Sequence, residues 1–165
     1  MKRICLCIFL IVFTVAAKAQ NTVQPVDSIN LDKYLGQWYE VARTEDFFWQ
    51  KNMVAVSVNY YERKGKKLKE ILLSHKKTVD GKQFKLKHHI RFYDNPKFTD
   101  LLGLRQQVLF IYGDYQFSLV GLKNKKAIWI MARTKQIDSA TFLRILDDAK
   151  ALGYDISKVK LMPQP

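Results

Sequence analysis

The chain contains little cysteine. Cys5 and Cys7 are its two cysteines in 165 residues, and both lie near the N-terminus. If residues 1–19 are removed on export, no thiol remains to form a disulfide, act as a nucleophile or bind a metal. A disulfide-stabilised scaffold and a thiol enzyme are therefore excluded. Stability must come from packing, and an apolar content of 48% in a chain of this length is enough for one core.

Long hydrophobic runs are also missing. The run from Ile4 to Val15 has twelve residues, whereas about 20 are needed to span a bilayer. It follows Lys2 and Arg3 and precedes Ala17-Lys18-Ala19, which is the order of a secretory signal peptide cleaved before Gln20. A membrane anchor is the alternative. Because no cysteine stands at the cleavage point, we expect an exported protein, periplasmic or secreted, that is not a lipoprotein.

Acidic residues are few compared with basic ones, and the formal net charge is +13. Residues 63–91 hold eleven basic side chains and only Glu70 and Asp80 as acids. Alternation places much of this charge on the outer face of two hairpins, where it would attract an anionic membrane surface. The alternative is a solvated face that protects strand edges from aggregation. Nucleic acid is not expected as a partner, because stacking aromatics are not interleaved with the basic positions.

Short runs rich in Val, Ile, Phe, Tyr and Leu follow a polar lead, residues 20–30. Their regular spacing is typical of an antiparallel all-β sandwich or barrel. The runs are residues 37–43, 53–63, 67–77, 82–93, 105–112, 115–122, 127–133 and 159–162. Between Asp138 and Leu152 the apolar positions recur at helical spacing, and Gly153 can end the helix. We expect one domain, residues 31–165, with this helix packed on the sheet.

Three motifs then suggest a family. The segment Gly36-Gln37-Trp38-Tyr39-Glu40-Val41-Ala42-Arg43 resembles the Gly-x-Trp signature of the lipocalins, in the form typical of their bacterial and apolipoprotein D-like branch. Gly113-Asp114-Tyr115 is similar to the second family block, although Gly113 stands where Thr is usual. Residues 129–134 are similar to the block that carries the family arginine. The resemblance implies an eight-stranded antiparallel up-and-down β-barrel with one C-terminal α-helix packed outside.

The family motif is expected to be structural. Its residues here are Gly36, Trp38, Asp114, Tyr115 and Arg133. Gly36 permits a tight turn into the first strand, and Trp38 plugs the closed end of the barrel. Strand parity allows the Arg133 guanidinium to lie across the Trp38 indole and to bind backbone carbonyls.

Inward residues above this floor are predicted to line a ligand cavity. In residues 83–93 the apolar side chains share one face, and Lys85, Lys87, His89 and Arg91 share the other. The candidate ligand-binding residues are Glu40, Ala42, Phe48, Phe84, Leu86, His88, Ile90, Phe92, Phe110, Tyr112, Trp129 and Met131. Hydrophobic walls with a few polar groups are usual in such cavities. The alternative is that these side chains simply fill a small barrel.

Several of these candidates have two interpretations. Glu40 is either a buried scaffold carboxylate held by Arg or Tyr, or a group that orients a polar head group. The aromatic run Phe47-Phe48-Trp49 either lines the entrance and touches a membrane, or folds into the barrel mouth. His88 is more often a core histidine than a ligand to metal or haem. No Asp or Glu joins the three histidines at metal-ligand spacing, so we expect no metal site.

The function that the resemblance implies is that of a carrier for a small hydrophobic or amphipathic ligand. Fatty acids or lysophospholipids are the implied class, and envelope lipid transport or storage is the implied role. The alternative is a filled barrel that binds anionic membranes through residues 63–91. The sequence contains no Ser-His-Asp order, paired carboxylates or phosphate-binding glycine loop, so we expect no enzyme. We expect no cofactor, and a monomer or weak dimer.

Overall fold

The computed structural model describes residues 24–45, 53–76, 83–100 and 103–164. The predicted signal peptide, residues 1–19, lies outside this part of the chain, and so does the aromatic run Phe47-Phe48-Trp49. Within the described part, no helix has both the length and the apolar character needed to cross a membrane.

The predicted β-rich organisation is confirmed. The helices are α1 (Leu31–Tyr34) and α2 (Ser139–Ala151). The strands are β1 (Gly36–Thr44), β2 (Met53–Lys64), β3 (Lys67–Lys76), β4 (Gln83–Asp94), β5 (Lys97–Thr99), β6 (Arg105–Tyr112), β7 (Phe117–Leu122), β8 (Ile128–Ala132) and β9 (Val159–Leu161). Between the predicted runs 82–93 and 105–112 the structure has a further strand, the three-residue β5.

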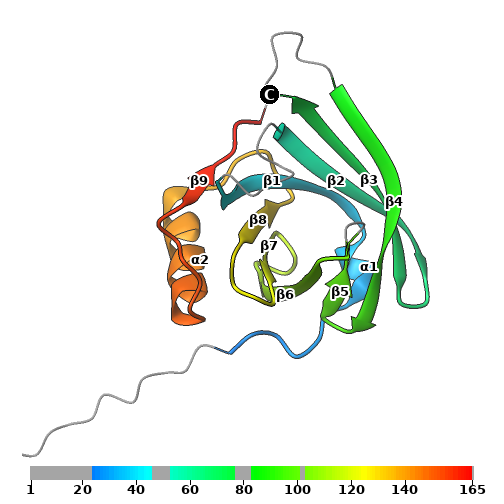
Figure 1. Ribbon diagram of the computed structural model, residues 1–165, viewed down its shortest axis with the longest axis horizontal. Helices are drawn as coiled ribbons and strands as arrows, with labels where there is room; N and C mark the ends of the chain where they lie inside the picture. Colours follow the sequence, from blue (N-terminus) through cyan, green and yellow to red (C-terminus); the bar gives the residue numbers. More distant parts are fainter. Residues whose placement is uncertain (1–23, 46–52, 77–82, 101–102, 165) are drawn as a thin grey trace, which may run out of the picture.

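Strands β1 to β8 form a closed antiparallel barrel (Figure 1). Each strand pairs with the next in sequence, and β1 pairs with β8 on one edge and with β2 on the other. Strand β9 pairs with the C-terminal half of β1, at Ala42 to Thr44, whereas β2 pairs with the N-terminal half. The fold is thus the predicted eight-stranded barrel with α2 packed outside.

The barrel has two apolar layers. One layer fills the barrel interior and includes Trp38 and Phe92. The other layer lies between the barrel wall and α2. Ile145 and Ala149 of α2 are fully buried in this outer layer, together with Leu119 and Ile130 of the wall. The outer layer explains why β6 and β8 are apolar on both faces, since α2 covers the side that faces away from the interior.

Two register shifts change the direction of side chains along the barrel wall. In β1, Glu40 pairs with Met131 and Ala42 pairs with Ile130, so Val41 is an extra residue. In β6, Val108 pairs with Val120 and Phe110 with Leu119, so Leu109 is an extra residue. An extra residue of this kind is a β-bulge, and it reverses the alternation of inward and outward side chains beyond it.

Candidate functional site

The floor of the barrel is built around Trp38. Its indole Nε1 donates a hydrogen bond to the Tyr34 carbonyl at 2.9 Å, and the Arg133 guanidinium lies 3.8 Å from the centre of its ring. Arg133 also donates to the backbone carbonyls of Lys33, Gln37 and Tyr115, at 2.7, 2.9 and 3.2 Å. The stacking and carbonyl contacts agree with the arrangement expected from strand parity. One side chain therefore joins α1, β1, β8 and the turn between β6 and β7.

The other motif residues also hold this end together. Gly36 has φ +96°, and a Cβ there would lie 3.3 Å from Arg133 Nη1, so both conformation and space favour glycine. Asp114 accepts a hydrogen bond from Lys33 Nζ at 2.8 Å, and the Tyr115 hydroxyl accepts one from the Asn30 backbone N–H at 2.6 Å. These contacts tie α1 to the β6–β7 turn and close the barrel below the cavity.

Above the floor the barrel encloses a cavity of about 310 Å³. Most of its wall is apolar, and the polar groups come from a few side chains on different strands. The lining residues are Tyr34, Glu40, Met53, Val56, Val58, Tyr60, Glu70, Leu72, Phe84, Leu86, Ile90, Phe98, Asp100, Gln106, Val120, Trp129 and Met131. This volume is at the lower end of the range for ligand pockets, and the wall has their usual composition.

A group of polar side chains lies deep in this cavity. Glu70 of β3 is 4% exposed and pairs across the strands with Tyr60 of β2, whose ring centre is 5.5 Å from that of Tyr34. Burial raises the pKa of Tyr60 well above its ordinary value, and the hydrogen-bonded Glu70 carboxylate raises it further. Gln106 Nε2 donates to Asp100 Oδ2 at 2.6 Å. The deep end of the cavity is therefore rich in acceptors.

Two tyrosine hydroxyls in the cavity remain protonated at neutral pH. Burial raises the pKa of Tyr34 to about 12, although its hydrogen bond with Ser118 opposes the shift. The distance between the Tyr34 hydroxyl oxygen and Ser118 Oγ is 3.2 Å. Since the pKa of Tyr60 is raised as well, both phenols keep their protons, and the Tyr60 hydroxyl donates its proton to the Glu70 carboxylate.

Glu40 forms an ion pair with Arg43. Arg43 Nη1 lies 2.6 Å from Glu40 Oε1, and both side chains are almost fully buried. Arg43 Nη2 also donates to the Met53 carbonyl at 2.6 Å. The bulge at Val41 makes this pair possible, because it turns Arg43 to the same side as Glu40. Of the two interpretations of Glu40, this geometry agrees with the scaffold carboxylate, although the side chain also touches the cavity.

The structure brings together about half of the candidate ligand-binding residues. Those in the cavity wall are Glu40, Phe84, Leu86, Ile90, Trp129 and Met131. Phe92 is fully buried but packs against Phe98, with ring centres 5.1 Å apart, and does not line the cavity. Phe48 and the side chain of His88 lie outside the described part of the structure.

Three candidates lie on the other side of the barrel wall, so their predicted inward direction is wrong. Ala42, Phe110 and Tyr112 belong to the layer under α2. Tyr112 donates a hydrogen bond to Asp148 Oδ2 of α2 at 2.9 Å, and burial, with Asp148, raises its pKa. The physical reason is the same in both strands. The bulges at Val41 and Leu109 reverse the alternation on which the prediction rested.

Sequence reasoning missed the contributions of β2, β3 and the β5–β6 region to the cavity. The missed residues are Tyr34, Met53, Val56, Val58, Tyr60, Glu70, Leu72, Phe98, Asp100, Gln106 and Val120. In β3 the sequence does contain a signal, because Leu68 and Leu72 alternate with Lys67 and Lys69. The same alternation places Glu70 on the inward face with the leucines. No such pattern marks Asp100. Within the described residues, no three His, Cys, Asp or Glu side chains gather as metal ligands.

Comparisons with known proteins agree with this architecture. A family model described as a lipocalin-like domain matches residues 29–164. Temperature-induced lipocalin-1 of Arabidopsis thaliana is 28% identical over 158 residues, covering 88% of this chain and 84% of that protein. Outer membrane lipoprotein Blc of Escherichia coli K12 is 24% identical over 163 residues, covering 95% of this chain and 92% of that protein.

Solved structures show the same fold at lower identity. Lobster apocrustacyanin A1 aligns with a TM-score of 0.65 at 16% identity, covering 90% of this chain and 94% of that one. The cockroach allergen Per a 4 aligns with a TM-score of 0.66 at 15% identity, covering 88% of this chain and 97% of that one. The family model covers most of the chain, and the closed barrel and the Trp38–Arg133 floor agree with it. The chain therefore belongs to the lipocalin family.

Proposed function

We propose that this protein is a carrier that binds one small hydrophobic or amphipathic molecule in the barrel cavity. The cavity of about 310 Å³, with its mainly apolar wall, is the observation that carries the proposal. Lipocalins are typically binding proteins, which supports a carrier rather than an enzyme. The open volume also argues against the alternative of a barrel filled by its own side chains.

The proposed ligand class is a single-chain lipid, a fatty acid or a lysophospholipid. The volume suits one acyl chain rather than two. The deep carboxylates Glu70 and Asp100 would repel a second carboxylate placed beside them. A fatty acid should therefore enter with its methyl end first.

The proposed setting is the cell envelope. Similar proteins of Vibrio cholerae and Escherichia coli are named outer membrane lipoproteins, which supports an exported protein of the envelope. This chain has no cysteine at the predicted cleavage point, so we propose export through residues 1–19 without lipid attachment. Intact mass measurement of the exported protein tests this. An N-terminus at Gln20 with no added lipid mass is expected, and a retained leader or an acylated protein would contradict it.

Native mass spectrometry tests the carrier function. The protein is purified without detergent from a lipid-rich host, and the bound species is extracted and identified. One lipid per protein is expected. A protein that carries nothing and gains nothing on incubation with oleic acid or oleoyl lysophosphatidylethanolamine would overturn the proposal.

A matched pair of variants locates the ligand. Leu86→Trp fills the cavity from β4 and should abolish lipid binding. Phe110→Ala removes an aromatic side chain from the layer under α2 and should lower stability while the folded protein keeps its ligand. Equal lipid loss in both variants would contradict binding in the cavity.

A further inference from the structure

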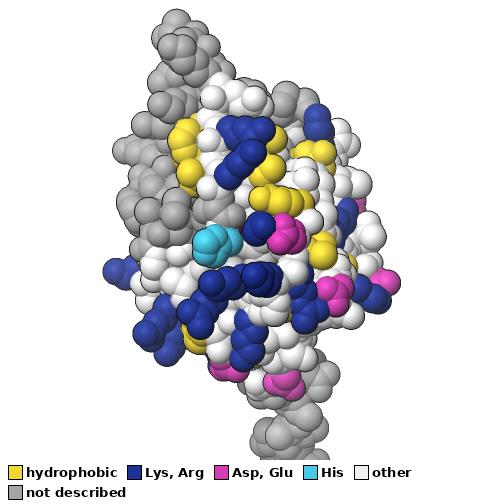
Figure 2. All heavy atoms as spheres, turned by 90° about the vertical axis from the view of Figure 1, so that its right-hand side faces the viewer, with side chains coloured by type: hydrophobic (Ala, Val, Ile, Leu, Met, Phe, Trp, Pro, Cys, Tyr) yellow, Lys and Arg dark blue, Asp and Glu magenta, His cyan; other side chains and the backbone are white. Residues whose placement is uncertain are grey.

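Basic side chains gather on the outer face of the barrel that Figure 2 shows, and Figure 1 places this face on the side away from α2. The strand register aligns five residues across the sheet, and four of them are basic. Lys64 pairs with Lys67, Lys67 with Arg91, Arg91 with Thr99, and Thr99 with Arg105. We call Lys64, Lys67, Arg91 and Arg105 the basic row. All four are exposed, and they come from β2, β3, β4 and β6.

This arrangement is unfavourable for the barrel itself. Like charges directly opposite each other in a sheet destabilise it. Nearby acids are paired elsewhere: Asp94 with Lys97 at 2.7 Å, Glu62 with Lys69 at 2.6 Å, and Asp32 with Arg63 at 2.5 Å. Among the described residues, none of the basic row forms an ion pair with a carboxylate. No described carboxylate therefore offsets the positive charge of the row, which indicates a role outside the fold.

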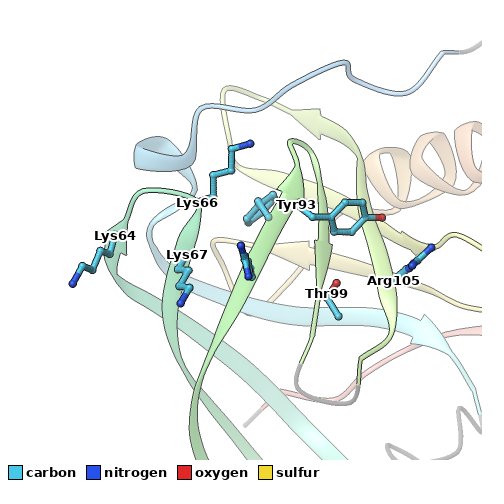
Figure 3. A pocket seen from close by; sticks show the side chains of 8 residues that line it. Lys64, Lys66, Lys67, Tyr93, Thr99 and Arg105 are labelled. Atoms are coloured by element: carbon cyan, nitrogen blue, oxygen red, sulfur yellow. The ribbon is translucent and has the colours of Figure 1, made fainter.

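The surface around the row is open and contains an aromatic side chain. A cleft of about 1010 Å³ is lined by the row together with Lys66, Phe92, Tyr93 and Thr99 (Figure 3). Tyr93 is 42% exposed on this face. The cations spread along several strands rather than converging on one point, so the surface fits an extended partner better than a small ion. Tyrosine beside cations is typical of surfaces that sit at lipid head groups.

We propose that the basic row docks the protein on an anionic lipid bilayer. Four cations with Lys66 beside them reach the number at which basic clusters bind acidic lipids. The charge is complementary to phosphate head groups, and Tyr93 can lie among them. A single-stranded nucleic acid would need aromatic platforms between the cations, whereas the residue between Arg91 and Arg105 is Thr99. This docking uses the outer wall and is independent of what the cavity holds.

Vesicle sedimentation tests the proposal with the protein as the host exports it. The probes are vesicles of phosphatidylcholine alone and vesicles of equal parts phosphatidylcholine and phosphatidylglycerol. Each basic residue near an anionic surface strengthens binding about five-fold. The triple variant Lys67→Gln, Arg91→Gln, Arg105→Gln should therefore bind the anionic vesicles roughly one hundred-fold more weakly. Its melting temperature should stay equal or rise, because opposed charges are removed.

A charge-matched control separates the row from net charge. Lys123→Gln, Lys126→Gln and Lys150→Gln remove the same three charges from exposed positions elsewhere. This variant should bind the anionic vesicles within about two-fold of the original protein, since these lysines lie outside the row. Equal weakening by both triple variants would overturn the proposal, and so would equal binding to the two kinds of vesicle. Tight binding to heparin without binding to vesicles would also overturn it and favour a soluble polyanion.

Discussion

At the scale of single residues, Arg133 holds the barrel floor through geometry that another cation does not reproduce. Its planar guanidinium donates to three backbone carbonyls while stacking on Trp38. Lysine carries a point charge on a flexible stem, so Arg133→Lys should lower the free energy of unfolding by about 2 kcal/mol. Arg133→Ala should cost more. Urea denaturation measures both, and an unchanged midpoint in Arg133→Lys would show that charge alone suffices.

Glu40 offers a test that separates scaffold from ligand contact. In Glu40→Gln the buried Arg43 guanidinium loses its ion pair with Glu40, and breaking a buried ion pair typically costs about 3 kcal/mol. The double variant Glu40→Leu, Arg43→Met replaces the pair with apolar side chains and should recover most of the lost stability. Both are measured by urea denaturation. A fully stable Glu40→Gln that no longer binds lipid would instead assign Glu40 to the head group.

At the scale of elements, periodicity predicted the strands and the helix because one face of each is buried. The predicted helical range, residues 138–152, includes all of α2. The solvent-facing side of β4 was predicted from its alternating lysines. Alternation failed where an extra residue entered a strand. Val41 and Leu109 look like any other apolar strand residues, so nothing in the local sequence marks the bulges that turn Ala42 and Phe110 outward.

The candidate site was harder to predict than the fold for a related reason. Glu70 and Asp100 are acids in the cavity wall, and local composition assigns such residues to the surface. Their burial depends on which strands close the barrel, which is a property of distant pairing. The family motif, in contrast, is local to each block, and Trp38 and Arg133 lie together as expected.

Helix α2 contains a cap whose contribution depends on pH. The Asp138 side chain accepts a hydrogen bond from the Thr141 backbone N–H at 2.9 Å, and this bond holds the pKa of Asp138 below its usual value. A lowered pKa in the folded state means that the stabilisation is complete at neutral pH and disappears as pH falls through that pKa.

Asp138→Asn should therefore keep the cap at neutral pH and lose less stability between pH 6 and about pH 3. Asp138→Ala should lower the melting temperature at neutral pH by about 2–4 °C. Thermal melts followed by circular dichroism across this pH range provide the measurement. Parallel acid profiles for Asp138→Asn and the original protein would show that the carboxylate adds nothing to the cap.

At the scale of the whole molecule, the barrel keeps three features apart: helix α2, the basic row and the cavity. Helix α2 lies on one side of the barrel and strands β2 to β4 lie on the opposite side (Figure 1). These strands carry Lys64, Lys67 and Arg91 of the basic row on their outer face, and the cavity lies inside the barrel. The Trp38–Arg133 floor closes one end of the cavity without touching the row. Binding in the cavity and docking through the row are therefore expected to be independent activities of one rigid scaffold.

Ionic strength should distinguish the two activities. The screening length falls from about 30 Å at 10 mM salt to about 8 Å at 150 mM, so docking through exposed cations should weaken steeply over that range. Binding of a zwitterionic lysolipid inside the barrel depends mainly on burial of apolar surface and should change less than about two-fold. Titration calorimetry with oleoyl lysophosphatidylethanolamine below its micelle concentration, and vesicle sedimentation at matched salt, measure the two in parallel. If both affinities fell together, ligand capture would occur through the basic row, and the cavity would not be the site of binding.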